Sequence, residues 1–535
     1  MIKKIFTIDA ETDPFDGTID IKPFVWGLYT EGFYKEIWSE SINDLIDYLK
    51  EQGECIVYAH NGGKFDFHFF MDLIKGGQEI TIIAGRIAKF KIGNIEFRDS
   101  YCILPVKLAT FNKDEFDYDK LHRSVRHLHT KEISEYLKND CRYLYNAVMD
   151  FRNHYGDALT IAGASIKVFS KMSKIKRPQT SAAFFDEFTE YYYGGRVECF
   201  KSGVFEKELT VIDINSAYPD AMSKYEHPYG NKFSLDDKLP KSEAYLRRSF
   251  IEIECESFGC FPVRTKTGLS FPCDGLIRLF KVSGHELFTA LELGLIKKYK
   301  IKSVKTFSDS INFKVYVDYF TELKISAKES GDKNLYIFAK LFLNALYGKY
   351  ASNFHKYSHY EVVHLGNVNQ KLMSDYNFCA ILSDTTCLMS CDLSEDEKRF
   401  LNVATAASIT GAVRANLMQA MHRCSQVYYC DTDSIVCESS GDLELHPTRL
   451  GAWDIEAKIT AAAFAGKKLY ALKLRDDYIK DGVTHKIASK GARLTPEEIF
   501  RVAAGEEIQY TSNVPTFSLG GVKLISRKIR KTIDI

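Results

Sequence analysis

Aspartates stand inside two segments of the chain that otherwise resemble β-strands. Segment 211–219 contains Asp213, and segment 428–434 contains Asp431 and Asp433. Runs of β-branched and aromatic residues bounded by turn-forming residues indicate strands. A buried carboxylate is unfavourable unless it is paired or bound to a metal. The three aspartates are therefore candidates for holding divalent cations.

Residues two apart on a strand point the same way, so Asp431 and Asp433 can face one ligand. With Asp213 they could hold two divalent cations about 4 Å apart, which would stabilise the attacking and leaving oxygens of a phosphoryl transfer. An Asp-Thr-Asp sequence also makes an ordinary turn. The interpretation therefore depends on the motifs that accompany it.

A cation, an amide and an aromatic ring recur on one face of the helical stretch 340–348. Lys340, Asn344 and Tyr347 lie at positions i, i+4 and i+7, which share a helix face. A plain polar stripe at a helix edge would give the same pattern. A cation on a fixed helical face, followed by an aromatic ring, is also what a triphosphate and a base–sugar unit require.

A second set of carboxylates lies in the N-terminal third. Asp9 and Glu11 stand two apart in a strand pattern, Asp66 follows an apolar run and a Gly-rich turn, and Asp140 lies one helical turn after Tyr136. Taken singly, each acid is typical of a turn or a helix cap. Brought together, the acids would repel one another unless two divalent metals bound them. The tyrosine could then orient an attacking water.

Length and composition predict several folded domains. The chain has 535 residues, of which 45% are hydrophobic and 27% charged, and this suits a globular protein of three or four domains. No apolar run reaches the roughly 18 residues of a membrane span, and the first residues lead straight into a strand pattern instead of a signal peptide. We therefore expect an intracellular protein without a membrane partner.

The formal net charge of zero excludes a protein that binds DNA by bulk charge alone. Basic residues gather at 171–177 and 527–531, although charge runs are usually solvated faces. The 13 cysteines include no CxxC pair, which suggests reduced thiols. Cys379, Cys387 and Cys391 form the closest cluster, either a zinc site or three unrelated thiols.

Together these motifs resemble those of family B DNA polymerases. Residues 213–219 are similar to the first palm motif, 340–348 to the fingers motif and 429–434 to the second palm motif, in the family's order. The N-terminal acids resemble the three exonuclease motifs of proofreading polymerases, which lie on an RNase H-like sheet. The Gly62-Gly63 pair departs from the single residue that the best-known phage members carry there.

The resemblance implies roles for the matching residues. Asp213 and Asp433 would hold two Mg²⁺ or Mn²⁺ ions, with Asp431 adjacent and Ile214 as a backbone ligand. The exonuclease, also with two ions, would use Asp9, Glu11, Asp66, Asp140, Tyr136 and Lys113. The nucleotide would be bound by Lys340, Lys328, Asn344, Tyr347, Tyr218, Ser216 and Ala217. DNA would be bound by Tyr192, Gly194, Gly195, Lys468, Tyr470, Asn61, Phe65, Ser100 and Lys490.

Several of these residues belong to recognisable family motifs. Segment 192–195 resembles the YxGG motif that couples the exonuclease and polymerase sites, and 468–470 resembles the KxY motif that contacts the primer strand. Tyr347 would stack near the nascent base pair. Tyr218 would exclude a ribose 2′-hydroxyl by its volume.

Two insertions favour one branch of the family. The first spans about 225–312, and the second includes an alternating, strand-like stretch at 355–363. Segments of this length in a compact enzyme are usually folded or functional. Both resemble the terminal-protein regions of protein-primed polymerases of the phage phi29 type. The second would arch over the DNA and close a ring with palm and thumb.

The expected fold is α/β and α+β multidomain, an RNase H-like 3′–5′ exonuclease domain followed by a right-hand polymerase of palm, fingers and thumb. The expected boundaries are exonuclease 1–160, first palm part 161–224, first insertion 225–315, fingers 316–351, second insertion 352–401, second palm part 402–487 and thumb 488–535.

The sequence thus predicts a monomeric DNA-directed DNA polymerase with 3′–5′ proofreading, primed by a terminal protein, processive and strand-displacing. It would replicate a viral or linear-plasmid genome, with template-primer DNA, single-stranded DNA and dNTPs as partners. The alternative is a polymerase of the same fold that extends nucleic-acid primers. A nuclease with a degenerate palm, or a non-catalytic scaffold, would lack carboxylates that this chain keeps.

Overall fold

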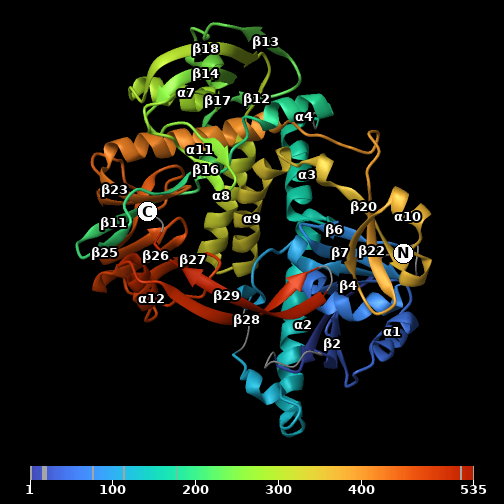
Figure 1. Cartoon of the computed structure of the whole chain (residues 1–535). Coiled ribbons are helices and arrows are strands. Elements are labelled where there is room, and N and C mark those ends of the chain that lie inside the picture. The colour runs from blue at the N-terminus through green and yellow to red at the C-terminus, as the bar shows by residue number, and fades with distance from the viewer. Residues whose placement is uncertain are drawn as a thin grey trace.

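Two large β-sheets stand on either side of a pair of long helices in the computed structural model (Figure 1). The structure describes residues 3–14, 21–74, 78–111, 115–176, 179–518 and 521–533. The N-terminal sheet, in blue, and the second sheet, mostly in orange and red, flank helices α8 (Lys314–Ser330) and α9 (Lys333–Tyr350).

The N-terminal sheet has seven strands in the order β3-β2-β1-β4-β8-β7-β6. They are β1 (Lys4–Thr12), β2 (Pro23–Thr30), β3 (Phe33–Ile37), β4 (Cys55–Ala59), β6 (Thr81–Ile83), β7 (Arg86–Ile92) and β8 (Ile95–Asp99). Strands β1, β4 and β8 run parallel, and the other pairings are antiparallel. Every residue of β2 and β4 is buried, as expected for a sheet covered on both faces.

Helices cover both faces of this sheet. On β1, Ile5 packs into the same core as α2 (Thr130–Tyr155), whereas Phe6 packs into the core that contains α1 (Ile42–Glu51). This alternation follows from the two-residue period of a strand. The core around α2 continues without interruption into the helix pair and the second sheet.

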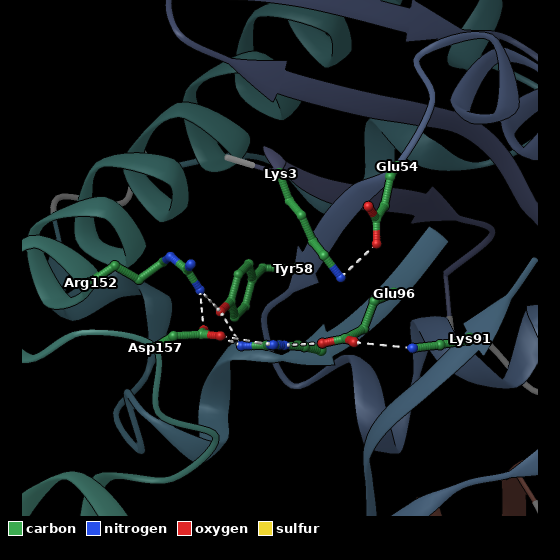
Figure 2. A network of polar contacts seen from close by, with 8 residues as sticks. Lys3, Glu54, Tyr58, Lys91, Glu96, Arg152 and Asp157 are labelled. Atoms are coloured by element: carbon green, nitrogen blue, oxygen red, sulfur yellow. Dashed lines mark hydrogen bonds and ion pairs between the residues drawn. The ribbon is translucent and has the colours of Figure 1, made fainter. Parts of the chain in front are cut away.

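The C-terminal end of α2 is tied to the sheet by a polar network (Figure 2). Arg152 Nη1 donates to Tyr58 Oη on β4 (2.9 Å) and pairs with Asp157. Arg98 on β8 donates through Nε to Glu96 (2.6 Å) and pairs with the same Asp157. Figure 2 shows Arg152, Asp157 and Tyr58 converging. The network fixes the helix that carries two of the expected exonuclease residues.

The second sheet is antiparallel throughout and has the order β27-β26-β25-β11-β24-β23-β9, with β10 also paired to β25. Its strands are β9 (Val197–Cys199), β10 (Gly203–Phe205), β11 (Leu209–Ile214), β23 (Ser425–Asp431), β24 (Ser434–Ser439), β25 (Trp453–Gly466), β26 (Leu469–Leu474) and β27 (His485–Ser489). Helices α5 (Ala217–Lys224) and α11 (Val403–Arg423) pack on it. Strands β11 and β23 both run antiparallel to β24, which lies between them. The two aspartate segments therefore end at the same edge of the sheet.

Helices α8 (Lys314–Ser330) and α9 (Lys333–Tyr350) form an antiparallel hairpin. Gly331 ends α8 in a left-handed conformation (φ +74°), which glycine adopts without strain. Asp332 then caps α9 by accepting from Leu335 N (3.0 Å). The helix predicted over 340–348 is confirmed within α9, whereas α8 begins two residues before the boundary expected for the fingers. Helices α3 (Ile161–Ser173) and α4 (Ala182–Thr189) precede the second sheet.

Residues of the first insertion fold around a four-stranded sheet above α11 (Figure 1). The sheet order is β13-β18-β14-β17, formed by β13 (Phe233–Asp236), β14 (Ser249–Ser257), β17 (Ile277–Ser283) and β18 (Ile296–Phe307). Two helices accompany it, α6 (Glu243–Arg247) and α7 (Gly284–Glu292). Smaller strand pairs are β12 (His227–Pro228) with β19 (Ser310–Ile311), and β15 (Val263–Thr265) with β16 (Gly268–Ser270). The insertion has a hydrophobic core of its own.

The second insertion is anchored on the N-terminal domain. Its elements are β20 (Ser358–His364), α10 (Gln370–Asp375), β21 (Asn377–Ile381) and β22 (Thr386–Asp392). Strand β20 pairs with β5 (Gln78–Glu79), and Ile80 N donates to Tyr360 O (3.1 Å). Val362 and Leu388 are fully buried in the core that also packs beneath the N-terminal sheet. The insertion therefore shares its core with that domain.

The chain ends with α12 (Pro496–Ala503), which packs on β25 and β26, and the long hairpin of β28 (Ile508–Ser518) and β29 (Gly521–Lys531). Within the described ranges, no helix has both the length and the apolar character that crossing a membrane requires.

Candidate active sites

The two aspartate segments of the second sheet meet at its edge. Asp213, at the end of β11, lies opposite Ser434 on β24 and Asp454 on β25. Ile214 N donates to Asp433 O (2.9 Å). This backbone bond joins the two segments directly, and the Asp433 charge acts on the Asp213 carboxylate, so the two carboxylates lie close together.

The electrostatics of this edge favour a cation. Burial, together with the charges of Asp433 and Glu456, raises the pKa of Asp213 to about 7 against the opposing effect of Lys486. Burial and the Asp431 carboxylate likewise raise the pKa of Asp433. Carboxylates that resist ionisation because they repel one another are stabilised by a bound divalent ion. The donor set therefore fits a metal.

Two acids of this edge escaped the sequence reasoning. Asp454 and Glu456 lie two apart on β25, beside Asp213. Asp431 and Asp433 were identified by their two-residue spacing, and the same spacing could have identified Asp454 and Glu456.

The residues expected to contact the primer lie beside Asp431. Lys468 Nζ forms an ion pair with the Asp431 carboxylate, and Lys468 N donates to Tyr429 Oη (2.8 Å). The Tyr470 ring packs edge-on against Tyr429, with ring centroids 5.0 Å apart. Lys490 N donates to Lys468 O (2.9 Å). The ammonium group of Lys468 thus compensates the charge of the Asp431 carboxylate.

Segment 192–195 supports the turn between Asp431 and Asp433. A Cβ atom on Gly195 would lie 2.5 Å from Thr432 Oγ1 and Cγ2, closer than atoms approach. Thr432 N donates to Arg196 O (2.6 Å). Gly195 is therefore required by close packing. Around Gly194 there is open space, and Tyr192 is half-buried.

Two aromatic rings expected at the nucleotide are stacked on each other. Tyr218 on α5 and Tyr347 on α9 have ring centroids 4.3 Å apart and planes 4° apart. Ser216 precedes α5 in a left-handed conformation (φ +58°), and Ala217 is buried. The strained residue turns the chain sharply from β11 into α5, and Tyr218 then lies close enough to Asp433 for that charge to raise the pKa of the phenol.

Lysines from both helices of the hairpin gather on one surface. Lys340 and Lys328 are exposed, and Asn344 Nδ2 donates to Lys340 O (3.1 Å). Lys324 joins them: burial lowers its pKa, and so do the charges of Lys340 and Lys328. Sequence reasoning missed Lys324, although it stands one helical turn before Lys328. Such a cluster is suited to a polyanion.

The N-terminal acids come from three elements. Asp9 and Glu11 lie on β1, Asp66 begins the 3₁₀ helix η2 (Asp66–Leu73), and Asp140 lies on α2. Burial raises the pKa of Asp66 well above its usual range, and the Asp9 charge adds to the effect. Asp66 Oδ1 is buried without a hydrogen-bond partner among the described residues. A buried oxygen of this kind fits a metal ligand.

Tyr136 stands next to this acid cluster. Its hydroxyl lies 3.0 Å from that of Tyr118, and its ring stacks on Phe116 with centroids 4.4 Å apart. Burial, the Tyr118 hydrogen bond and the Asp140 charge all raise the pKa of Tyr136. The phenol is therefore held protonated and oriented. Lys113 lies outside the described residues.

The Gly62-Gly63 pair is explained by packing. A Cβ atom on Gly62 would lie 2.6 Å from Ala59 Cβ, and one on Gly63 would lie 2.1 Å from Ile87 O. The turn η1 (Gly62–Lys64) therefore sits directly against β4 and β7. This close approach places Asp66 at the carboxyl end of β4.

Three residues that were expected to bind DNA lie at or near this turn. Asn61 adopts a left-handed conformation (φ +60°) and accepts a hydrogen bond from Arg86 (3.0 Å). The Phe65 ring packs edge-on against Phe69, with centroids 5.4 Å apart. Ser100 is fully buried and donates to a backbone carbonyl of β4. In this structure, then, the Ser100 hydroxyl faces the interior.

Within the described ranges, no three His, Cys, Asp or Glu side chains lie close enough together to hold a metal ion unaided. Mg²⁺ is usually bound by one or two carboxylates together with water and substrate phosphates, so paired aspartates suit it. Cys379, Cys387 and Cys391 are free thiols, and Cys379 Sγ donates to Ser390 Oγ (3.1 Å).

Comparison with known proteins agrees with this geometry. Residues 109–435 match the family described as DNA polymerase type B, organellar and viral. The DNA-directed DNA polymerase of Enterobacteria phage PRD1 is 37% identical, over 99% of this chain and 98% of its own length. The DNA polymerase of Bacillus phage phi29 is 27% identical over 75% of this chain and 71% of its own. Phi29 DNA polymerase, solved with primer-template DNA and incoming nucleotide substrates, covers 99% of this chain and all of its own at a TM-score of 0.75 and 21% identity.

The chain belongs to the organellar and viral type B DNA polymerases, and the resemblance to family B predicted from the motifs is confirmed. Its fold is that of phi29 DNA polymerase. It is a DNA-directed DNA polymerase of the phage PRD1 and phi29 type. Family B polymerases generally use divalent metal ions, in line with the acids at the edge of the second sheet.

Proposed function

We propose that this polymerase proofreads with a separate 3′–5′ exonuclease site and starts synthesis on a terminal protein. The observation that carries the proofreading part of the proposal is the presence of two carboxylate clusters at two different sheets, each with raised aspartate pKa values. One cluster suits nucleotide addition and the other suits removal of the last nucleotide.

At the polymerase site, Asp213 and Asp433 would hold two Mg²⁺ ions, with Asp431 adjacent and the Ile214 carbonyl as a further ligand. When bound, the ions supply charge stabilisation for the attacking and leaving oxygens. The clustered lysines Lys340, Lys328 and Lys324 would neutralise the triphosphate. Tyr347 and Tyr218 form an aromatic wall for the base and sugar. A rigid ring at Tyr218 leaves no room for a ribose 2′-hydroxyl.

At the exonuclease site, Asp9, Glu11, Asp66 and Asp140 would hold two further ions. Tyr136 keeps its proton, so its hydroxyl can donate to the attacking water or to the phosphate and orient it. The single-stranded primer end would enter along Asn61 and Phe65. Phi29 DNA polymerase has been solved with single-stranded DNA as well as with primer-template DNA, which supports both kinds of partner here.

The two insertions support the protein-primed branch. The chain aligns over nearly its whole length with the PRD1 polymerase and shares the fold of the phi29 polymerase, insertions included. We assign the terminal-protein regions to 225–315 and 352–401, the fingers to 316–351 and the thumb to 488–535. The enzyme would act as a processive, strand-displacing monomer in the host cytoplasm and replicate a linear genome.

Transfer of a labelled nucleotide to protein tests this proposal. The enzyme is incubated with Mg²⁺, α-³²P-labelled dNTP and each protein encoded beside its own gene. We expect one of these proteins to carry label that survives denaturation and nuclease treatment, and the Asp433→Ala variant to label none. Efficient extension of a DNA primer with no protein labelled would favour the nucleic-acid-primed alternative.

A further inference from the structure

The backbone carbonyls that follow α4 are held by an arginine of the first insertion. Carbonyls at a helix C-terminus lack partners within the helix and carry partial negative charge. Arg264, on β15, donates to Thr189 O (2.9 Å), Glu190 O (3.2 Å) and Tyr192 O (2.7 Å). One exposed guanidinium therefore fixes three carbonyls of the segment that leads to Gly195.

A second arginine holds the next two carbonyls. Arg414 Nη1 donates to Tyr193 O (2.6 Å) and Gly194 O (2.9 Å). Its Nε and Nη2 form a bidentate ion pair with Glu286 (2.8 and 3.0 Å), and both side chains are buried. Both guanidinium groups also contact the Tyr193 ring, whose centroid lies 4.4 Å from Arg264 and 5.5 Å from Arg414.

This arrangement joins the first insertion to the second sheet. Arg264 and Glu286 belong to the insertion, whereas Arg414 lies on α11. Helices α7 and α11 touch so closely that a Cβ atom on Gly411 would lie 2.1 Å from Ser283 Oγ. Bidentate arginine contacts fix geometry as well as charge. The segment 189–194 is therefore clamped by residues that come from outside the sheet.

The clamped segment ends at the catalytic turn. Gly195 packs against the Thr432 side chain without room for a Cβ atom, and Arg196 O accepts from Thr432 N. Thr432 stands between Asp431 and Asp433. A shift of the segment would therefore move the carboxylates themselves.

We propose that Arg264 and the Arg414–Glu286 pair are positioning residues for nucleotide addition, which act through the backbone of 189–196 on the turn that carries Asp431 and Asp433. The inference rests on the proposed role of these two aspartates as metal ligands. It gives the first insertion a role in every nucleotide addition, including elongation from a DNA primer, in addition to its role in priming.

The test is Arg264→Ala, because Arg264 is exposed and its loss leaves no buried charge. The matched control is Arg278→Ala in the same insertion, where the arginine pairs only with Asp274 among the described residues. Single-nucleotide addition to a DNA primer is measured against dNTP and Mg²⁺ concentration, together with degradation of single-stranded DNA and thermal unfolding.

We expect Arg264→Ala to lower kcat about tenfold or more, since small displacements of catalytic groups have effects of this size. The Mg²⁺ concentration for half-maximal rate should rise severalfold. The KM for dNTP, single-strand degradation and the unfolding temperature should match those of Arg278→Ala. Arg264→Lys, which retains a cation but not the fork of donors, should lie between. Glu286→Gln should reproduce the altered Mg²⁺ dependence if it unfolds at the normal temperature.

Equal kinetics for Arg264→Ala and Arg278→Ala would overturn the inference. A variant that loses nucleotide addition and single-strand degradation together, with a lower unfolding temperature, would also overturn it. The Asp433→Ala variant separates this failure from that of the proposed function. If Asp433→Ala still adds nucleotides, the metal assignment itself is wrong. If it does not, and Arg264→Ala behaves like the control, only the positioning role fails.

Discussion

Replacing Asp213 by asparagine should stabilise the metal-free enzyme at alkaline pH. Burial and the neighbouring acids raise the pKa of Asp213 from its ordinary 3.8 to about 7. The folded state therefore holds this proton more tightly than the unfolded chain does. The unfavourable effect of ionising Asp213 in the folded state builds up as pH rises from about 4 to 7, and it is complete above pH 7. Asparagine, which cannot ionise, removes it.

The size of the effect follows from the pKa difference. At about 1.4 kcal/mol per pH unit, the full difference would approach about 4 kcal/mol. Because Asp213 is only half-buried and solvent screens its charge, we expect about 1–2 kcal/mol. For a domain of ordinary size this raises the unfolding temperature by about 2–6 °C.

The assay is thermal unfolding in EDTA at pH 8 and pH 5, for wild type, Asp213→Asn and the control Asp384→Asn, whose aspartate lies exposed before β22. The gain for Asp213→Asn should be largest at pH 8 and smaller at pH 5. Excess Mg²⁺ should then stabilise wild type more than the variant. An unfolding temperature unchanged at pH 8, or a gain independent of pH, would refute the electrostatic account of this edge.

Three further outcomes follow from the structure. Tyr218→Val should relax selection against ribonucleotides roughly tenfold or more, whereas deoxynucleotide addition changes little; competition between rNTP and dNTP measures this. Lys324→Ala should raise the KM for dNTP about fivefold, which corresponds to about 1 kcal/mol for one partly screened charge. The control Lys314→Ala, on the same helix, should leave the KM unchanged. Leu388→Ala, in the core shared by the second insertion and the N-terminal domain, should cost about 2–5 kcal/mol and lower the temperature at which single-strand degradation is lost. Ile381→Ala, exposed in the same insertion, should leave that temperature unchanged.

Spacing along the chain was enough to identify candidate residues that lie on the same helix or strand. Asp431 and Asp433 share a strand end, and Lys340, Asn344 and Tyr347 share a helix, so the two-residue and 3.6-residue periods revealed them. The family B resemblance then supplied the order of the domains, which no period contains.

Contacts between distant segments could not be read in this way. Glu286 and Arg414 lie 128 residues apart and meet only because α7 packs against α11. In the same way, β20 pairs with β5 across about half of the chain. The sequence showed that the second insertion would form strands but not that its core belongs to the N-terminal domain. Removing 352–401 would therefore also expose that domain's interior, and point variants such as Leu388→Ala separate the two effects better.

The most direct test of the account is a reciprocal pair of variants at the two acid clusters. Nucleotide addition to a DNA primer and degradation of single-stranded DNA are measured for Asp433→Ala and Asp66→Ala, with folding checked by thermal unfolding. We expect Asp433→Ala to lose nucleotide addition but still degrade single-stranded DNA. Asp66→Ala should lose degradation, still add nucleotides and make more misincorporation errors. Loss of both activities in either folded variant would contradict two separate sites.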